Sequence, residues 1–450
     1  MSTLEPTAIL AAGLTADLAE RAVRLRFKEL TTPVQTLARQ CLLDWLGVSL
    51  GARREPLVDM LTATELDQGG APQAAVIGRQ ERLSVQQAAL INGAMGHALD
   101  YDDVASGVGH PTAPVAPAVL ALGEHLEASG AAALTAFVTG YETEARVARF
   151  MGPSHYDRGW HSTATFGAFG AAAAAAHLLG LSPLQTRHAF GIAGTQAAGL
   201  KSMFGTMCKP LHAGLAAQAG VRAALLAARG FSSNTEVLET PQGFGATQSE
   251  QTNPAAALAP PSHGFHILAN LFKYHAACYL THSTIEAIRS LRLSRPDAAQ
   301  EVAAIRIAVA PTHLKVCDIP LARTGLECKF SIRTLAGLTL LGEDTSDEAL
   351  YSDATAARAD VARLRDLAVV EPSSTGTLAH VELQLRDGQV LKASKDVGVP
   401  ETDLEQQGVR LEAKFRRLAA GAANAEAVIA ACAGLAEAPN LSALVAAVTA

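Results

Sequence analysis

The chain has 450 residues, of which 49% are hydrophobic and 18% charged, and its net charge is −7. This length is sufficient for two domains with a large core, and the mild negative charge argues against general nucleic-acid binding. The six cysteines form no C-x-x-C pair, which argues against disulfides and zinc-ribbon sites. Residues 1–17 carry acids but no basic stretch, and no long apolar run is free of histidine and charge. We therefore expect a cytoplasmic protein with no secretory signal and no membrane span.

Apolar side chains recur at helical spacing over the first half of the chain. In residues 34–48 they leave Arg39 and Asp44 on the opposite, solvent-facing side. Ser182-Pro183 is a helix start, with serine as N-cap and proline as first helical residue, and Gly230 is a stop. The pattern predicts further helices over residues 84–99, 113–129, 131–150, 162–179, 183–198 and 211–228.

A proline-rich linker, residues 249–262, separates this helical half from a segment of different periodicity. Residues 303–309 alternate as a strand, and Asp387-Gly388 is typical of a two-residue hairpin turn between two further strands. Helical segments are predicted over 284–290, 330–341 and 347–367, and again over 404–419 and 425–435. We expect a mostly α protein. A large all-helical domain comprises residues 1–265 and is completed by 400–450, and a smaller α+β lid domain comprises residues 266–399.

Three short polar segments interrupt the alanine-rich first half, and the first contains Asp100, Asp102, Asp103 and His110. A histidine beside carboxylates can act as a general base, although a solvated acidic loop with a capping histidine fits equally well. The same residues are candidate metal ligands, but they lack the regular ligand spacing and central glycine of a calcium loop. We therefore expect no metal at these residues.

The second and third polar segments each precede an Ala/Gly-rich helix. His161 with Ser162 and Thr163 lies at a helix start, where free N–H groups favour an anion such as a substrate carboxylate. Alternatively, Ser162 or Thr163 only caps that helix. Lys209 opens the next such helix, with His212 in its first turn. A cation at a helix start is unfavourable by roughly a few tenths of a kcal/mol, which indicates a ligand; an ordinary exposed lysine is the alternative.

Beyond the linker, Lys273, Cys278 and His282 gather in one short run. Such a polar run beside a hinge is a place where two domains can close on a substrate. The alternative is the start of an amphipathic helix with a buried cysteine.

Four motifs in order resemble those of the MmgE/PrpD family, which contains 2-methylcitrate dehydratases, cis-aconitate decarboxylases and iminodisuccinate epimerases. The motifs are Asp100-x-Asp102-Asp103 with His110-Pro111, Gly159-Trp160-His161, Lys209-Pro210-Leu211-His212 and Lys273-x-x-x-x-Cys278-Tyr279-x-x-His282. The similarity covers nearly the whole chain. It implies a helical domain built from both chain ends, an α+β lid domain, a homodimer, and cofactor-free chemistry on a small di- or tricarboxylate.

The resemblance also implies roles for particular residues. Removal or delivery of a proton beside a carboxylate needs a base, an acid and cations that stabilise the developing negative charge. The candidate catalytic residues are His110, His161, Asp100, Lys209 and His282. The candidate substrate-binding residues are Lys273, Cys278, Ser162, Thr163 and Asp103.

The chain also departs from the patterns of individual branches. Methylcitrate dehydratases usually have a longer, tryptophan-containing loop before His-Pro-Ser-Asp-Asn, where this chain has His110-Pro-Thr-Ala-Pro114. Decarboxylases usually have threonine after the aspartate pair and histidine at the place of Cys278; here residue 104 is valine. The segments around Trp160 and Cys278 are most similar to the epimerase branch. We place a dehydratase-like lyase first, with an epimerase, a decarboxylase and a non-catalytic carboxylate-binding protein as alternatives.

We predict a homodimer. The Ala/Gly-rich segments 167–179 and 213–228 present small side chains that allow close packing and suit an extended apolar interface. Light scattering at micromolar concentration should give twice the mass of the 46.6 kDa chain. The mass of a single chain under those conditions would contradict this prediction.

Overall fold

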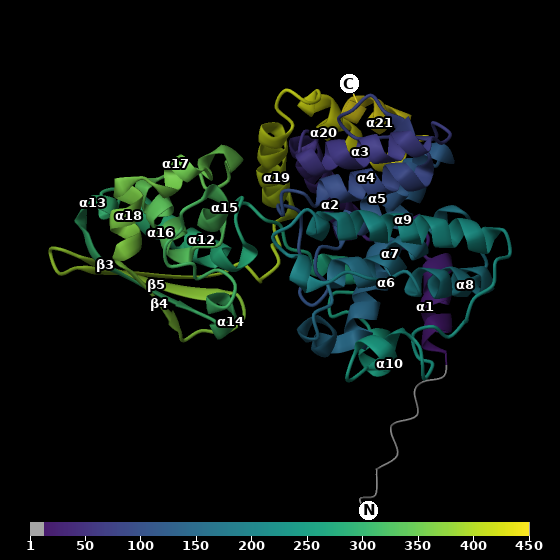
Figure 1. Ribbon diagram of the computed structural model, residues 1–450, viewed down its shortest axis with the longest axis horizontal. Coiled ribbons are helices and arrows are strands. Elements are labelled where there is room, and N and C mark those ends of the chain that lie inside the picture. The colour runs from purple at the N-terminus through teal and green to yellow at the C-terminus, as the bar shows by residue number, and fades with distance from the viewer. Residues whose placement is uncertain (1–12, 450) are drawn as a thin grey trace, which may run out of the picture. The chain divides into compact units, whose positions relative to one another are not determined.

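The computed structural model describes residues 13–449, and contacts divide them into two units (Figure 1). The first unit runs to Asn270 and resumes at Thr402, and the second comprises Leu271–Glu401. The first is a bundle of helices from both chain ends, and the second combines helices with a four-stranded sheet. The mostly α fold class predicted from the sequence is thereby confirmed.

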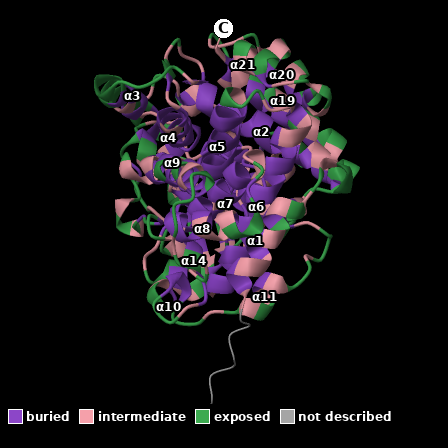
Figure 2. Cartoon of the chain, turned by 90° about the vertical axis from the view of Figure 1, so that its right-hand side faces the viewer, coloured by how far each residue is buried: buried purple, intermediate pink, exposed green. Residues whose placement is uncertain are grey.

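The first unit is built around helix α7 (Ser162–Leu178), which packs against α6 (Gly130–Asp157) and α9 (Cys208–Ala228). Helices α4 (Val85–Gly96) and α5 (Thr112–His125) complete this central layer. Figure 2 shows these inner helices as the buried part of the unit. The helices around them are α1 (Leu14–Arg24), α2 (Thr32–Ala52), α3 (Pro56–Gln68), α8 (Pro183–Gly194), α10 (Phe244–Gln248), α11 (Pro254–Leu258), α19 (Leu404–Leu418), α20 (Ala425–Ala433) and α21 (Ser442–Thr449). A short hairpin, β1 (Ala74–Ala75) with β2 (Arg82–Leu83), was not predicted.

Small residues let the central helices approach closely. A Cβ atom at Gly214 of α9 would lie 2.2 Å from the carbonyl oxygen of Leu90 in α4. At Gly220, further along α9, a Cβ would lie 2.4 Å from Cβ of Ala171 in α7. These small residues therefore set the spacing of helices whose ends carry the polar segments.

Helix α9 is the one described helix that is long and apolar enough to span a membrane by length and composition. Of its most apolar window, 61% is buried inside the protein. Its buried positions pack against α4 and α7, as those of a central helix in a folded core do.

The returning C-terminal chain supports the core from α19, which packs on α2. Lys414 of α19 places its Nζ 2.6 Å from Oδ1 of Asp44, and both side chains are buried. Asp44 was expected on the solvent side of its helix, and this is wrong because α19 covers that side. Lys414 Nζ also donates to the carbonyl oxygen of Tyr101, 2.7 Å away. The C-terminal segment thus supports the first polar segment.

The second unit has a sheet with the strand order β4-β3-β5-β6. Strand β3 (Val302–Val309) pairs in parallel with β4 (Ala368–Pro372) and antiparallel with β5 (Leu378–Leu385). Strand β6 (Val390–Asp396) pairs antiparallel with β5. The alternation in β3 and the hairpin were predicted, whereas β4 was missed because it begins directly after a helical segment and ends in proline. The helices of this unit are α12 (His282–Ser294), α13 (Ala298–Glu301), α14 (Pro311–Leu314), α15 (Gly325–Lys329), α16 (Ile332–Leu341), α17 (Asp353–Ala356) and α18 (Ala359–Asp366).

Candidate functional site

The first polar segment begins where α4 ends, at Gly96. A Cβ there would lie 1.9 Å from Nε1 of Trp45, so glycine lets α2 pack against the last turn of α4. The predicted helix to residue 99 stops short, and Asp100 has a φ of 51°, in the left-handed region that aspartate tolerates better than most residues. This turn directs the side chains of His97, Asp100 and Asp102 toward His110.

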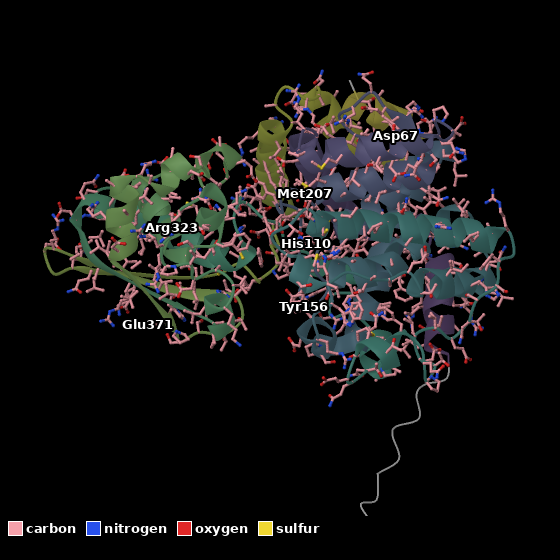
Figure 3. The ribbon with its side chains drawn as sticks, in the orientation of Figure 1. Asp67, His110, Tyr156, Met207, Arg323 and Glu371 are labelled. Atoms are coloured by element: carbon pink, nitrogen blue, oxygen red, sulfur yellow. The ribbon has the colours of Figure 1, made fainter. Side chains whose placement is uncertain are left out.

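Gly109 and Thr163 fix the position of His110 at the start of α5. Gly109 has a φ of 111°, and a Cβ there would lie 2.6 Å from Oγ1 of Thr163 in α7. The same hydroxyl accepts a hydrogen bond from the backbone N–H of His110 at 3.1 Å. Thr163, expected to bind substrate, therefore supports the backbone of His110. Figure 3 marks His110 in the helical unit.

Asp102 joins two imidazoles in the interior. Nδ1 of His97 donates to both carboxylate oxygens at 3.0 Å, and Nδ1 of His110 lies 3.2 Å from Oδ2. Burial alone raises the pKa of a carboxyl group, but the two imidazoles outweigh it and hold the pKa of Asp102 well below its ordinary value. Burial lowers the pKa of His97 to about 4, against the opposing effect of Asp102. At neutral pH, His97 is therefore a neutral imidazole that stabilises the carboxylate as an N–H donor.

Asp100 and Lys209 bring the third polar segment to the same place. Nζ of Lys209 lies 2.8 Å from Oδ1 of Asp100, and Nε2 of His110 lies 3.5 Å from that oxygen. Both partners of this ion pair are partly exposed, with 15% of the Lys209 side chain and 34% of the Asp100 side chain accessible. The ammonium also lies 5.5 Å from the ring centre of Phe204. A cation at this helix start is thus compensated by a carboxylate and stays accessible to a ligand.

The second polar segment contributes His161, which directly precedes α7. Its ring stacks at 5.9 Å from that of His97 and lies 5.0 Å from that of Phe204. Its Nδ1 lies 3.1 Å from Nδ1 of His212 in the first turn of α9. Burial, together with His97, Lys209, His110 and His212, lowers the pKa of His161 far below its ordinary value. His161 is thus a neutral imidazole beside the cationic Lys209.

Asp103 takes a different place from the one expected of a substrate-binding residue. Oγ1 of Thr112 donates to its Oδ2 at 2.6 Å, and the Thr112 N–H lies 3.4 Å from Oδ1, which ties Asp103 to the start of α5. The side chain is buried, and burial with the nearby carboxylates of Asp102 and Asp44 raises its pKa to about 8. Ser162, the first residue of α7, is also buried.

Lys273, Cys278 and His282 belong to the second unit. Lys273 is buried, and the Cys278 N–H donates to the carbonyl oxygen of Lys329 at 3.0 Å. Nε2 of His282 donates to the carbonyl oxygen of Ala277 at 3.1 Å, and its ring packs 4.9 Å from that of His275. Within this unit, His282 therefore joins the start of α12 to the preceding loop.

The structure brings Asp100, His110, His161 and Lys209 together, and it adds three residues that were not among the catalytic or substrate-binding residues expected from the sequence. These are His97, Asp102 and His212, each within 3.5 Å of a predicted residue or of one another. The sequence held two signals: His97 lies three residues before Asp100, and His212 follows Lys209 by three. We call the seven residues the polar cluster; they are His97, Asp100, Asp102, His110, His161, Lys209 and His212.

Four members of the polar cluster have the donor types of a transition-metal site. One ligand atom from each of His97, Asp100, Asp102 and His110 lies within 4.8 Å of the others. However, Asp102 already faces two imidazoles and Asp100 faces the ammonium of Lys209. The carboxylates therefore have compensating partners among the described residues, which favours proton transfer over metal binding.

Comparison with known proteins shows the family of the chain. The MmgE/PrpD N-terminal domain matches residues 16–257, and the MmgE/PrpD C-terminal domain matches residues 275–435. The chain belongs to the MmgE/PrpD family. The resemblance stated from the four motifs is thereby confirmed, and the first of these domains contains the whole polar cluster.

Several relatives are named for one activity. Cis-aconitate decarboxylase-like protein oryM of Aspergillus oryzae is 32% identical over 302 residues, which are 63% of each chain. Cis-aconitate decarboxylase of Aspergillus terreus is 30% identical over 303 residues, 63% of this chain and 61% of that protein. Cis-aconitate decarboxylase of Homo sapiens is 32% identical over 240 residues, 52% of this chain and 50% of that protein. The chain therefore matches between 50% and 63% of the length of these relatives.

We predict that Asp102→Asn lowers kcat on the true substrate by about 10²–10⁴, since the amide no longer offers His97 and His110 a shared carboxylate. The matched control is Asp103→Asn. The carboxyl group of Asp103 has a pKa of about 8 and is largely protonated at neutral pH, and an amide resembles that form. Steady-state kinetics of both variants measure the effect. Equal losses in the two variants would contradict a special role for Asp102.

We also predict that activity is independent of a divalent ion. Dialysis against EDTA, followed by metal analysis, should leave kcat unchanged because the carboxylates are already compensated by imidazoles and an ammonium. Activity that disappears on dialysis and returns with one divalent ion would make His97, Asp100, Asp102 and His110 its ligands instead.

Proposed function

We propose that this protein is a lyase that moves a proton at a carbon beside a carboxylate of a small di- or tricarboxylate. The observation that carries the proposal is the polar cluster. It places a partly exposed ammonium, that of Lys209, beside two imidazoles and a buried carboxylate. Cation and acid–base groups in one place are what such a reaction needs.

In the proposed reaction, Lys209 binds a substrate carboxylate and exchanges its contact with Asp100 for one with the ligand. The free N–H groups at the start of α7 assist, because they favour negative charge. The proton is moved by His110, which Asp102 orients through Nδ1, leaving Nε2 directed toward Asp100. His161 is the second acid–base group. As a neutral imidazole, it can either give or take a proton according to its tautomer.

Two lyase reactions are candidates. Dehydration of a 2-hydroxy tricarboxylate is the reaction that the sequence analysis placed first. Loss of CO₂ from cis-aconitate now has equal support, because the relatives described above are named for it. Both reactions exchange a proton at a carbon beside a carboxylate, so one polar cluster can serve either.

Epimerisation of an amino- or imino-dicarboxylate is the second candidate function. It requires one base to remove a proton and a second group to return it on the opposite face. The presence of two separate imidazoles, His110 and His161, favours epimerisation. Val104 and Cys278 favour it as well, because decarboxylases usually have threonine and histidine at these two positions.

The test is a panel of carboxylates incubated with the protein in D₂O and followed by NMR. The panel comprises cis-aconitate, 2-hydroxy tricarboxylates and amino-dicarboxylates. A lyase yields CO₂ or a new double bond, whereas an epimerase introduces deuterium without changing the carbon skeleton.

Lys209→Met should raise KM for the substrate at least tenfold, because it removes the cation that binds the substrate carboxylate. Lys201→Met is the matched control, since that lysine packs on the ring of Tyr156. If the wild-type protein neither converts any carboxylate of the panel nor exchanges its protons for deuterium, the proposed function is wrong.

A further inference from the structure

His161 and His212 face each other through the same ring atom. Their Nδ1 atoms are 3.1 Å apart, and both residues are buried, with 3% and 9% of their surfaces exposed. Two Nδ1 atoms can share a hydrogen bond only if one carries a proton and the other does not. In a neutral pair the imidazoles are therefore opposite tautomers. The donor has a bare Nε2, and the acceptor has a protonated Nε2.

The surroundings favour the neutral pair. His161 is surrounded by the rings of His97 and Phe204, and the ammonium of Lys209 belongs to the same cluster. Burial and His97 lower the pKa of His212, so neither ring readily takes an extra proton at neutral pH. The pair then has two protons distributed over four ring nitrogens, one of them between the rings.

Gly199 holds this contact together. Its carbonyl oxygen accepts the N–H of His161 at 2.9 Å, and its φ of 143° suits glycine. A Cβ at this position would lie 2.8 Å from Cβ of Ala164 and 3.3 Å from Nδ1 of His212. Gly199 therefore contacts the Nδ1 side of the His212 ring and also holds the backbone of His161, so one residue fixes both partners.

We propose that His212 is a positioning residue that relays protons between His161 and water. When Nε2 of His161 takes a proton from substrate, the proton on its Nδ1 crosses to Nδ1 of His212, and the proton on Nε2 of His212 leaves to water. Both rings end neutral with their tautomers exchanged. Proton delivery to substrate follows the same steps in reverse. This role rests on the proposed function, and it assigns water access to His212, the more exposed ring of the pair.

The kinetic test uses His212→Asn. The shorter amide can keep a hydrogen bond to Nδ1 of His161 but cannot pass a proton on. We expect kcat to fall at least tenfold in dilute buffer and to recover severalfold as imidazole buffer is added, because imidazole replaces the missing relay. The control is His177→Asn, whose histidine bonds the Ala22 carbonyl oxygen at the far end of α7; its kcat should not depend on buffer. Wild-type turnover in His212→Asn, or a loss that imidazole does not relieve, would overturn the relay.

A second measurement needs no substrate. Histidine ¹⁵N NMR of the wild-type protein near pH 7 should show His161 and His212 as neutral rings of opposite tautomer. Identical tautomers, or a charged ring in the pair, would overturn the inference even if the protein is an active lyase. If the tautomers are opposite but the protein turns over no carboxylate, the proposed function is wrong, whereas the hydrogen-bonded pair of neutral imidazoles is confirmed.

Discussion

The buried carboxylate of Asp102 is the constraint on which the rest of the site depends. An ionised carboxylate removed from water costs several kcal/mol unless it is paired and hydrogen-bonded. Here His97 donates from the end of α4, and His110 approaches from the start of α5. The loop between these helices must therefore adopt one conformation, including the left-handed Asp100, to satisfy Asp102. That conformation also directs Asp100 toward Lys209.

The polar cluster combines charged groups with buried imidazoles that stay neutral. It contains two carboxylates, one ammonium and four imidazole rings. His97 is neutral through burial, and His161 is neutral through burial and the nearby cationic groups. Neutral imidazoles can both give and take protons, which is the property that proton transfer at a weakly acidic carbon requires. A further buried ion pair, between Lys414 and Asp44, lies outside the cluster, and Lys414 also supports the loop by donating to the carbonyl oxygen of Tyr101.

Much of the fold could be predicted from the sequence, because helical periodicity and hairpin signals are local. The sequence also identified Asp100, His110, His161 and Lys209, since polar residues in an alanine-rich chain are conspicuous. It favoured Asp103 over Asp102, whereas Asp102 is the one that contacts the imidazoles. Neighbouring residues in a loop point in different directions, and only the tertiary contacts with His97 and Thr112 separate them. The burial of Asp44 was equally hidden, because its cover comes from α19, 370 residues further along the chain.

The most direct test of the account is a crystal structure of the protein with a tricarboxylate bound, such as cis-aconitate soaked into His110→Asn crystals to slow turnover. The account predicts a ligand carboxylate within hydrogen-bond distance of Lys209 Nζ. It also predicts that the carbon beside that carboxylate lies within reach of the His161 ring and residue 110. A tricarboxylate bound elsewhere, with Lys209 still paired to Asp100, would contradict the claim that the polar cluster is the site of proton transfer.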